Sequence, residues 1–92
     1  MKPLQKVAVF LVIIGIERGR SIISLMDSDE INAVIPEIRN LMGLSQEIKK
    51  SVWADFEQLG YEDKMKPFEA LGVIRLLFNG SKISDKSRRR FF

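Results

Sequence analysis

The 92-residue chain contains no histidine and no cysteine, 46% of its residues are hydrophobic, and its formal net charge is +3. The missing residue types exclude thiolate nucleophiles, the usual general base and most zinc sites, so an enzyme is not expected. The length predicts a single domain with a modest core, which a partner that buries further apolar surface would stabilise.

The first predicted element is the apolar run over residues 7–14, which Gly15 closes. Lys6 and Glu17 bracket only ten uncharged residues, whereas a membrane-spanning helix needs roughly 20. A secretory signal is not expected either, because residues 15–20 lack the small-residue pattern of a cleavage site. The chain is therefore predicted to be cytosolic.

The secondary structure of this run is ambiguous in isolation, because a short apolar run can be a buried strand or a buried helix. No other segment has the pattern of a strand that could pair with it, so we predict a helix enclosed by other helices. The following segment, residues 16–26, places Ile16, Gly19, Ile23 and Met26 along one face of a second helix.

The third predicted helix starts at Asp27, which forms a capping-box-like pair with Glu30. Met26 can pack against Ile31 across the first turn. Pro36 lies on the polar face and removes one backbone hydrogen bond, which predicts an outward bend rather than a break. The apolar residues of this helix recur at spacings typical of one helical face: Ile31, Val34, Ile35, Ile38, Leu41 and Met42.

Two further helices follow. Ser45 is predicted to cap the fourth helix at the amide of Glu47 or Ile48, and Gly60 to end it. The fifth is predicted to begin at Pro67 and to end at residues 79–80, with Gly72 weakening it locally. The stripes predicted to be buried are Ile48, Val52, Phe56 and Leu59 in the fourth helix, and Phe68, Leu71, Ile74 and Leu77 in the fifth.

Two short motifs have a chemical interpretation beside a structural one. Asp27, Asp29 and Glu30 could hold a divalent cation, but the EF-hand spacing is absent and helix capping accounts for all three. The pair Gly15 and Gly19 lacks the lysine that follows the second glycine of a phosphate-binding loop. The structural interpretation is preferred for both, and no metal or other cofactor is predicted.

The basic excess is confined to the C-terminus, where residues 81–92 carry five basic side chains and one acidic one. Residues 1–80 carry ten basic and eleven acidic side chains. We therefore predict a helical partner-binding domain over residues 1–80, followed by a basic tail or the start of a linker helix over residues 81–92. The segment Arg88-Arg89-Arg90-Phe91-Phe92 could contact anionic lipid or nucleic acid, but a helix capped by Ser84 that leads into a missing or disordered continuation is preferred.

Three segments carry a family resemblance. They are Lys6-Val7-Ala8-Val9-Phe10-Leu11-Val12-Ile13-Ile14-Gly15, Met26-Asp27-Ser28-Asp29-Glu30-Ile31 and Glu37-Ile38-Arg39-Asn40-Leu41. They resemble the Lys-x-Ala-x-x-Leu-x-x-Leu-Gly opening, the acidic cap and the Glu-Ile-x-x-Leu helix of the N-terminal domain of the bacterial flagellar motor switch protein FliG. The resemblance covers about residues 4–59, and Gly72-Val73-Ile74-Arg75-Leu76-Leu77 is a fainter counterpart of the family's later Gly-Gly-x-x-Tyr-Ala-x-x-Leu-Leu segment.

The resemblance implies an all-α, armadillo-like bundle of about five helices, peripheral to the inner membrane on the cytoplasmic side of the flagellar basal body. It implies a non-catalytic adaptor that anchors the motor switch ring to the MS ring by binding the C-terminal helices of the MS-ring protein. Self-association in a ring would follow from the same role. The family's middle and C-terminal domains are not in this sequence, which predicts an excised domain or a shortened relative without torque generation.

A small bundle can enclose the apolar opening helix only in part, and a large exposed apolar patch usually marks an interaction site. A partner helix laid into an apolar groove is the binding mode we expect. The candidates for lining this groove are Phe10, Ile14, Ile23, Val34 and Ile38, although each could instead belong to the core. The alternative function is a small helical nucleic-acid-binding module that uses the basic tail, and the steep salt dependence of phosphate contacts would distinguish the two.

Overall fold

The computed structural model describes residues 2–41 and 43–79. These residues form helices only, in the order α1 (Pro3–Ile13), α2 (Ile16–Ile23), α3 (Ser28–Arg39), α4 (Gln46–Gln58) and α5 (Pro67–Asn79). The prediction of a small all-α bundle of about five helices is confirmed. Met42 and the basic tail, with the predicted Ser84 cap and residues 88–92, lie outside the described residues.

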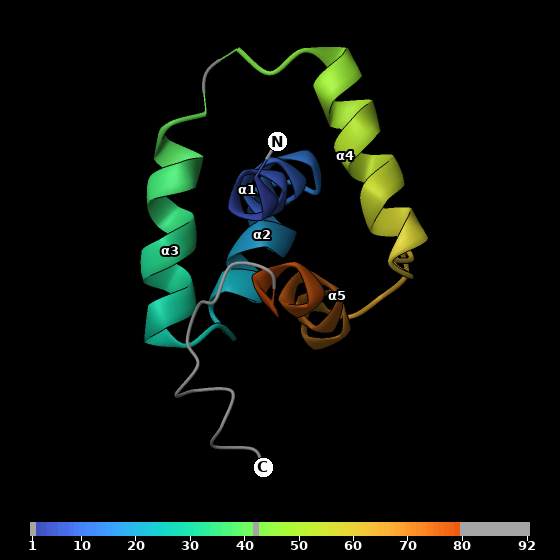
Figure 1. Cartoon of the computed structure of the whole chain (residues 1–92). Coiled ribbons are helices and arrows are strands. Elements are labelled where there is room, and N and C mark those ends of the chain that lie inside the picture. The colour runs from blue at the N-terminus through green and yellow to red at the C-terminus, as the bar shows by residue number, and fades with distance from the viewer. Residues whose placement is uncertain (1, 42, 80–92) are drawn as a thin grey trace.

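Helix α1 occupies the centre of the bundle, with α3 and α4 standing on opposite sides of it (Figure 1). It contacts each of the other four helices. Residues Val7, Ala8, Val9, Phe10 and Leu11 are at most 4% exposed, because a helix without a polar face is stable only where protein surrounds it. The apolar run is thus a helix, as predicted, and its enclosure ends at Val12, which is 44% exposed.

An aromatic cluster joins α1 to α4 and to the segment that follows α4. The rings of Phe10 and Phe56 stack with their centroids 4.0 Å apart, and Tyr61 meets Phe10 edge-on at 4.8 Å. Trp53 stacks on Phe10 at 6.1 Å. Burial raises the pKa of the Tyr61 phenol, although the positive charge of Arg18 lowers it. Tyr61 therefore contributes an uncharged ring to the core.

The start of α3 is stabilised by the predicted capping box. The Glu30 amide donates to Asp27 Oδ1 at 2.9 Å, and the Asp27 amide donates to Glu30 Oε1 at 2.9 Å. The helix continues through the exposed Pro36, whose carbonyl accepts a hydrogen bond from the Asn40 amide at 3.0 Å. The prediction that Pro36 does not break the helix is confirmed, and the outward bend stays a prediction.

Glu30 has a second role that the capping pattern did not indicate. Its side chain is buried, and it accepts hydrogen bonds from Arg75 of α5, from Nε to Oε2 at 2.9 Å and from Nη2 to Oε1 at 3.0 Å. The hydrogen bond to Glu30 raises the pKa of Arg75, which therefore stays charged. This bidentate pair links the start of α3 to α5.

The predicted boundaries of α4 and α5 are confirmed. Ser45 Oγ accepts a hydrogen bond from the Ile48 amide at 3.1 Å, which caps α4. Gly60 follows the end of α4 with a φ of +104°, a conformation in which glycine is strongly favoured. Helix α5 begins at Pro67.

Two residues predicted to be buried at helix ends are exposed instead. Leu59 is 37% exposed because α4 ends at Gln58, and Tyr61, only 5% exposed, takes the core position beyond it. Phe68 is 66% exposed. It lies about 120° around α5 from the fully buried Ile74 and therefore faces away from the core.

Candidate partner-binding groove

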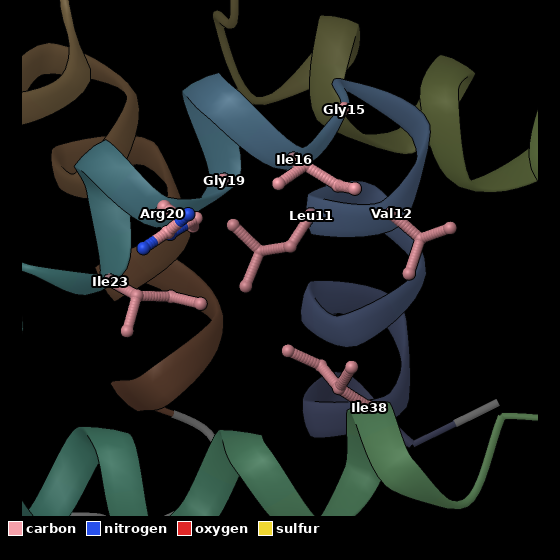
Figure 2. Close-up of a pocket in the computed structure, with 8 residues that line it drawn as sticks. All are labelled: Leu11, Val12, Gly15, Ile16, Gly19, Arg20, Ile23 and Ile38. Atoms are coloured by element: carbon pink, nitrogen blue, oxygen red, sulfur yellow. The ribbon is translucent and has the colours of Figure 1, made fainter.

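An apolar groove opens between α1, α2 and α3 (Figure 2). Its volume is about 270 Å³. Leu11 and Val12 of α1 form one wall, and Ile38 reaches the groove from α3. The α2 wall consists of Ile16, Gly19, Arg20 and Ile23. Apart from Arg20 the lining residues are apolar, so the groove offers a partner mainly hydrophobic contact.

Two glycines shape this groove. Gly15 precedes α2 with a φ of +98°, which lets the chain turn sharply from α1 into α2. At Gly19, an added Cβ atom would lie 3.1 Å from the carbonyl oxygen of Leu11, so the missing side chain lets α2 approach the backbone of α1 closely. The glycine pair that could have suggested a phosphate-binding loop has a turning and packing role here.

The edge of the groove exposes large apolar side chains. Ile16 is 78% exposed and Val12 is 44% exposed, whereas Leu11 is only 4% exposed. Ile23 and Ile38 are partly buried between these extremes. Neighbouring exposed apolar side chains of this kind are typical of a surface that another molecule covers.

The five predicted groove residues lie at different depths. Ile23 and Ile38 line the groove. Phe10 and Val34 are 0% exposed in the core and have no surface to offer a partner in this conformation. Ile14 lines a separate hollow of about 120 Å³ beside Tyr61 and Met65.

Val12 and Ile16 are groove residues that the sequence-based selection missed. The apolar spacing of the second helix had already placed Ile16 on the same face as Ile23. Three of the four residues on the predicted face, Ile16, Gly19 and Ile23, line the groove, whereas the fourth, Met26, is 7% exposed and belongs to the core. The residue of α2 that enters the core is Ile22, which is 2% exposed. The spacing therefore grouped Ile16, Gly19 and Ile23 correctly, but it did not separate them from Met26 or indicate that they face a groove and not the core.

Arg20 is the charged side chain at the groove. It is exposed and forms no ion pair or side-chain hydrogen bond with another described residue. Arg18, one half-turn earlier on α2, is engaged instead by Asp63, with its Nη1 donating to Oδ1 at 2.9 Å. The guanidinium of Arg20 is thus available to a ligand of opposite charge.

Other kinds of site find little support in the described part of the chain. Across residues 2–41 and 43–79, no three histidine, cysteine, aspartate or glutamate side chains cluster as metal ligands would. Asp27 and Glu30 are engaged in capping. None of the helices described is long and apolar enough to cross a membrane. The groove is therefore the strongest candidate for a functional site in this part of the molecule.

Comparison with known protein families identifies the family to which the chain belongs. The family model of the FliG N-terminal domain matches residues 1–81. The chain belongs to the FliG N-terminal domain family. The resemblance inferred from residues 4–59 is thereby confirmed and extends through α5. No curated protein and no solved structure gives a significant match.

Membership assigns this FliG N-terminal domain to the flagellar motor switch and hence to bacterial motility. The family is a structural part of the motor, whose location is the flagellar basal body. The groove is built entirely from α1, α2 and α3 and the turn at Gly15, all of which lie within the matched residues.

Proposed function

We propose that this FliG N-terminal domain anchors the motor switch ring to the MS ring by binding the C-terminal helices of the MS-ring protein in the groove. The observation that carries the proposal is the apolar groove with Ile16 78% exposed at its edge, in a chain of the motor switch family. In this role the domain lies on the cytoplasmic face of the basal body, peripheral to the inner membrane.

The size of the groove determines how a helix engages it. A cavity of about 150 Å³ holds a group the size of benzene, so a groove of about 270 Å³ accepts one or two apolar side chains. An amphipathic helix presents such anchors three or four positions apart. We therefore place the anchors of the partner helix in the groove and the rest of its apolar face against Val12 and Ile16.

The exposed side chains set the expected strength of this contact. Complete burial of an isoleucine side chain contributes about 1.5–3 kcal/mol, and most of the Ile16 side chain is still available for burial by a partner. A tenfold change in affinity corresponds to about 1.4 kcal/mol. Loss of the Ile16 contact alone is thus large enough to measure.

The proposal is tested by calorimetric titration of the 92-residue chain with a peptide of the MS-ring protein's C-terminal tail. Ile16→Glu is expected to weaken binding about tenfold or more, because it places a charge at the edge of the apolar groove. Phe68→Glu is the matched control. Ile16 and Phe68 both lie in the first turn of a helix and are both well exposed, and glutamate is favourable at such positions.

Three results bear on the proposal. Saturable binding that Ile16→Glu weakens and Phe68→Glu leaves within about twofold supports it. Equal effects of the two substitutions, or no heat from a chain whose thermal melt shows it folded, contradict it. Binding that falls by a factor of a thousand or more between low and moderate salt would instead point to phosphate-type contacts and to the nucleic-acid alternative.

A further inference from the structure

A second hollow lies beside the C-terminal end of α1, between α1 and α4. Val12 lines the groove, and the next residue, Ile13, lines a hollow of about 300 Å³ against α4. The apolar side chains of this second hollow, here called the α4 hollow, are Ile13, Trp53 and Ala54. Val12 and Ile13 are consecutive in α1 and their side chains point about 100° apart around the helix, so the two hollows lie on neighbouring sides of its C-terminal end.

Positive charge predominates along this combined surface. Arg20 lies at the groove, and Lys49, Lys50 and Glu57 line the α4 hollow. None of the three cations forms an ion pair with another described residue. Taken together, the two hollows therefore form a surface that offers apolar side chains in each hollow and carries three available positive charges against one negative charge.

We propose that the occupant of this surface is an acidic amphipathic helix. Its apolar side chains enter both the groove and the α4 hollow, and its carboxylates pair with Arg20 at one end and with Lys49 and Lys50 at the other. This inference rests on the proposed function and specifies the chemistry of the partner segment. It makes the three cations specificity-determining residues, because a neutral or basic helix with the same apolar face would lack these pairs.

The magnitudes limit what each charge contributes. An exposed ion pair changes affinity only a few-fold, and a bidentate arginine–carboxylate pair is at the upper end of that range. Three such pairs acting together correspond to a change of about tenfold in affinity, with a further gain in association rate at low salt. The test therefore neutralises all three cations at once.

The experiment titrates the 92-residue chain with two tail peptides of the MS-ring protein. The first, called the natural tail, has its natural sequence. The second, called the amide tail, has every Asp replaced by Asn and every Glu replaced by Gln. The variant Arg20→Gln/Lys49→Gln/Lys50→Gln removes the proposed partners. The control variant Arg39→Gln/Lys64→Gln/Lys66→Gln removes the same charge from exposed positions that line neither hollow.

We expect the wild-type chain and the control variant to bind the natural tail about tenfold more tightly than the amide tail. The variant lacking Arg20, Lys49 and Lys50 is expected to bind both tails with the same weaker affinity. If the wild-type chain binds the two tails equally, this inference is overturned while the proposed function stands. If it binds neither tail, both are overturned.

Trp53 provides a separate test of the α4 hollow, since it is the chain's single tryptophan. A tail peptide in which any tryptophan is replaced by phenylalanine should shift the emission of Trp53 along the same saturation curve as the heat. Calorimetric binding without a change in emission would show that the α4 hollow is not occupied and would overturn that part of the inference.

Discussion

Gly19 is a residue at which α2 approaches the backbone of α1 closely. The position that a Cβ would take is 3.1 Å from the Leu11 carbonyl oxygen, whereas nothing lies within 4 Å of the same position at Gly72 of α5. Both residues lie inside helices, where glycine costs about 1 kcal/mol relative to alanine. The same substitution at the two sites therefore separates helix propensity from packing.

We predict that Gly72→Ala raises the free energy of unfolding by about 0.5–1 kcal/mol, because it gains helix propensity in open space. Gly19→Ala should lower it by about 0.5–2 kcal/mol, because the Leu11 carbonyl belongs to the backbone of the central helix and cannot easily move away. Urea denaturation followed by circular dichroism measures both. Equal stabilisation by the two substitutions would show that α1 and α2 can separate without cost.

Single residues also show the limit of apolar periodicity as a guide to binding. Phe10 and Ile38 both belong to apolar stripes, yet Phe10 is completely buried and Ile38 lines the groove. Periodicity identifies the face on which a side chain lies. How deeply the side chain is buried depends on the neighbouring helices, and the spacing within one helix carries no information about them.

At the level of elements, α3 combines a strong start with a weak interior. The Asp27–Glu30 capping box satisfies two amides at its first turn. Pro36, near its C-terminal end, has no amide hydrogen to donate to the carbonyl of Asn32. The helix persists because its apolar face packs on the core, where Val34 is 0% exposed.

Pro36→Ala is expected to raise the free energy of unfolding by about 1–2 kcal/mol. It restores one backbone hydrogen bond and removes the proline ring from the helix interior, with a partial loss because proline also restricts the unfolded chain. Asn32→Ala, exposed on the same helix, is the control and should stay within about 0.5 kcal/mol of the wild type. A Pro36→Ala effect no larger than the control would mean that α3 bends around the proline at no energetic cost.

The helix boundaries that a cap or a proline marks were predicted correctly, whereas α1 begins at Pro3, before the predicted apolar run, and α2 ends at Ile23 rather than at Met26. The caps at Asp27 and Ser45 and the start at Pro67 act over three or four residues, so the local sequence contains everything they need. The buried faces near helix ends were less predictable. Leu59 and Phe68 continue the apolar spacing of their helices. Leu59 is nevertheless partly exposed just after the end of α4, and Phe68 is exposed in the first turn of α5.

Across the whole molecule, the Glu30–Arg75 pair joins helices that are distant in sequence. The two residues are 45 positions apart, and the bidentate contact places the start of α3 against α5. Glu30 is buried, so its carboxylate depends on these hydrogen bonds for charge compensation. The arginine side chain is 43% exposed, so its own desolvation is only partial.

We expect Arg75→Met to lower the free energy of unfolding by about 1.5–3 kcal/mol, because a buried carboxylate then loses its charged donor. Arg39→Met removes an exposed arginine at the end of α3 and should cost no more than about 0.5 kcal/mol. Equilibrium urea unfolding of the two variants at neutral pH decides the matter. Similar values for both would show that the pair adds nothing to stability beyond the capping of α3.

The sequence by itself determined the class of the fold, the family, the start of α3 and the boundaries of α4 and α5. These properties depend on spacings, caps and motifs within one segment, where each residue acts on neighbours a few positions away. The spacing also placed Ile16, Gly19 and Ile23 on one face of α2, although it added Met26, which belongs to the core.

Only the tertiary structure decided which apolar residues form the core and which form the groove. Ile22 is 2% exposed and Ile23 lines the groove, although they are adjacent and chemically identical. The α4 hollow and the Glu30–Arg75 pair likewise arise where separate helices meet. The burial of a side chain depends on how neighbouring helices pack against its own helix. This packing is defined only in the folded bundle, where α1 contacts the other four helices.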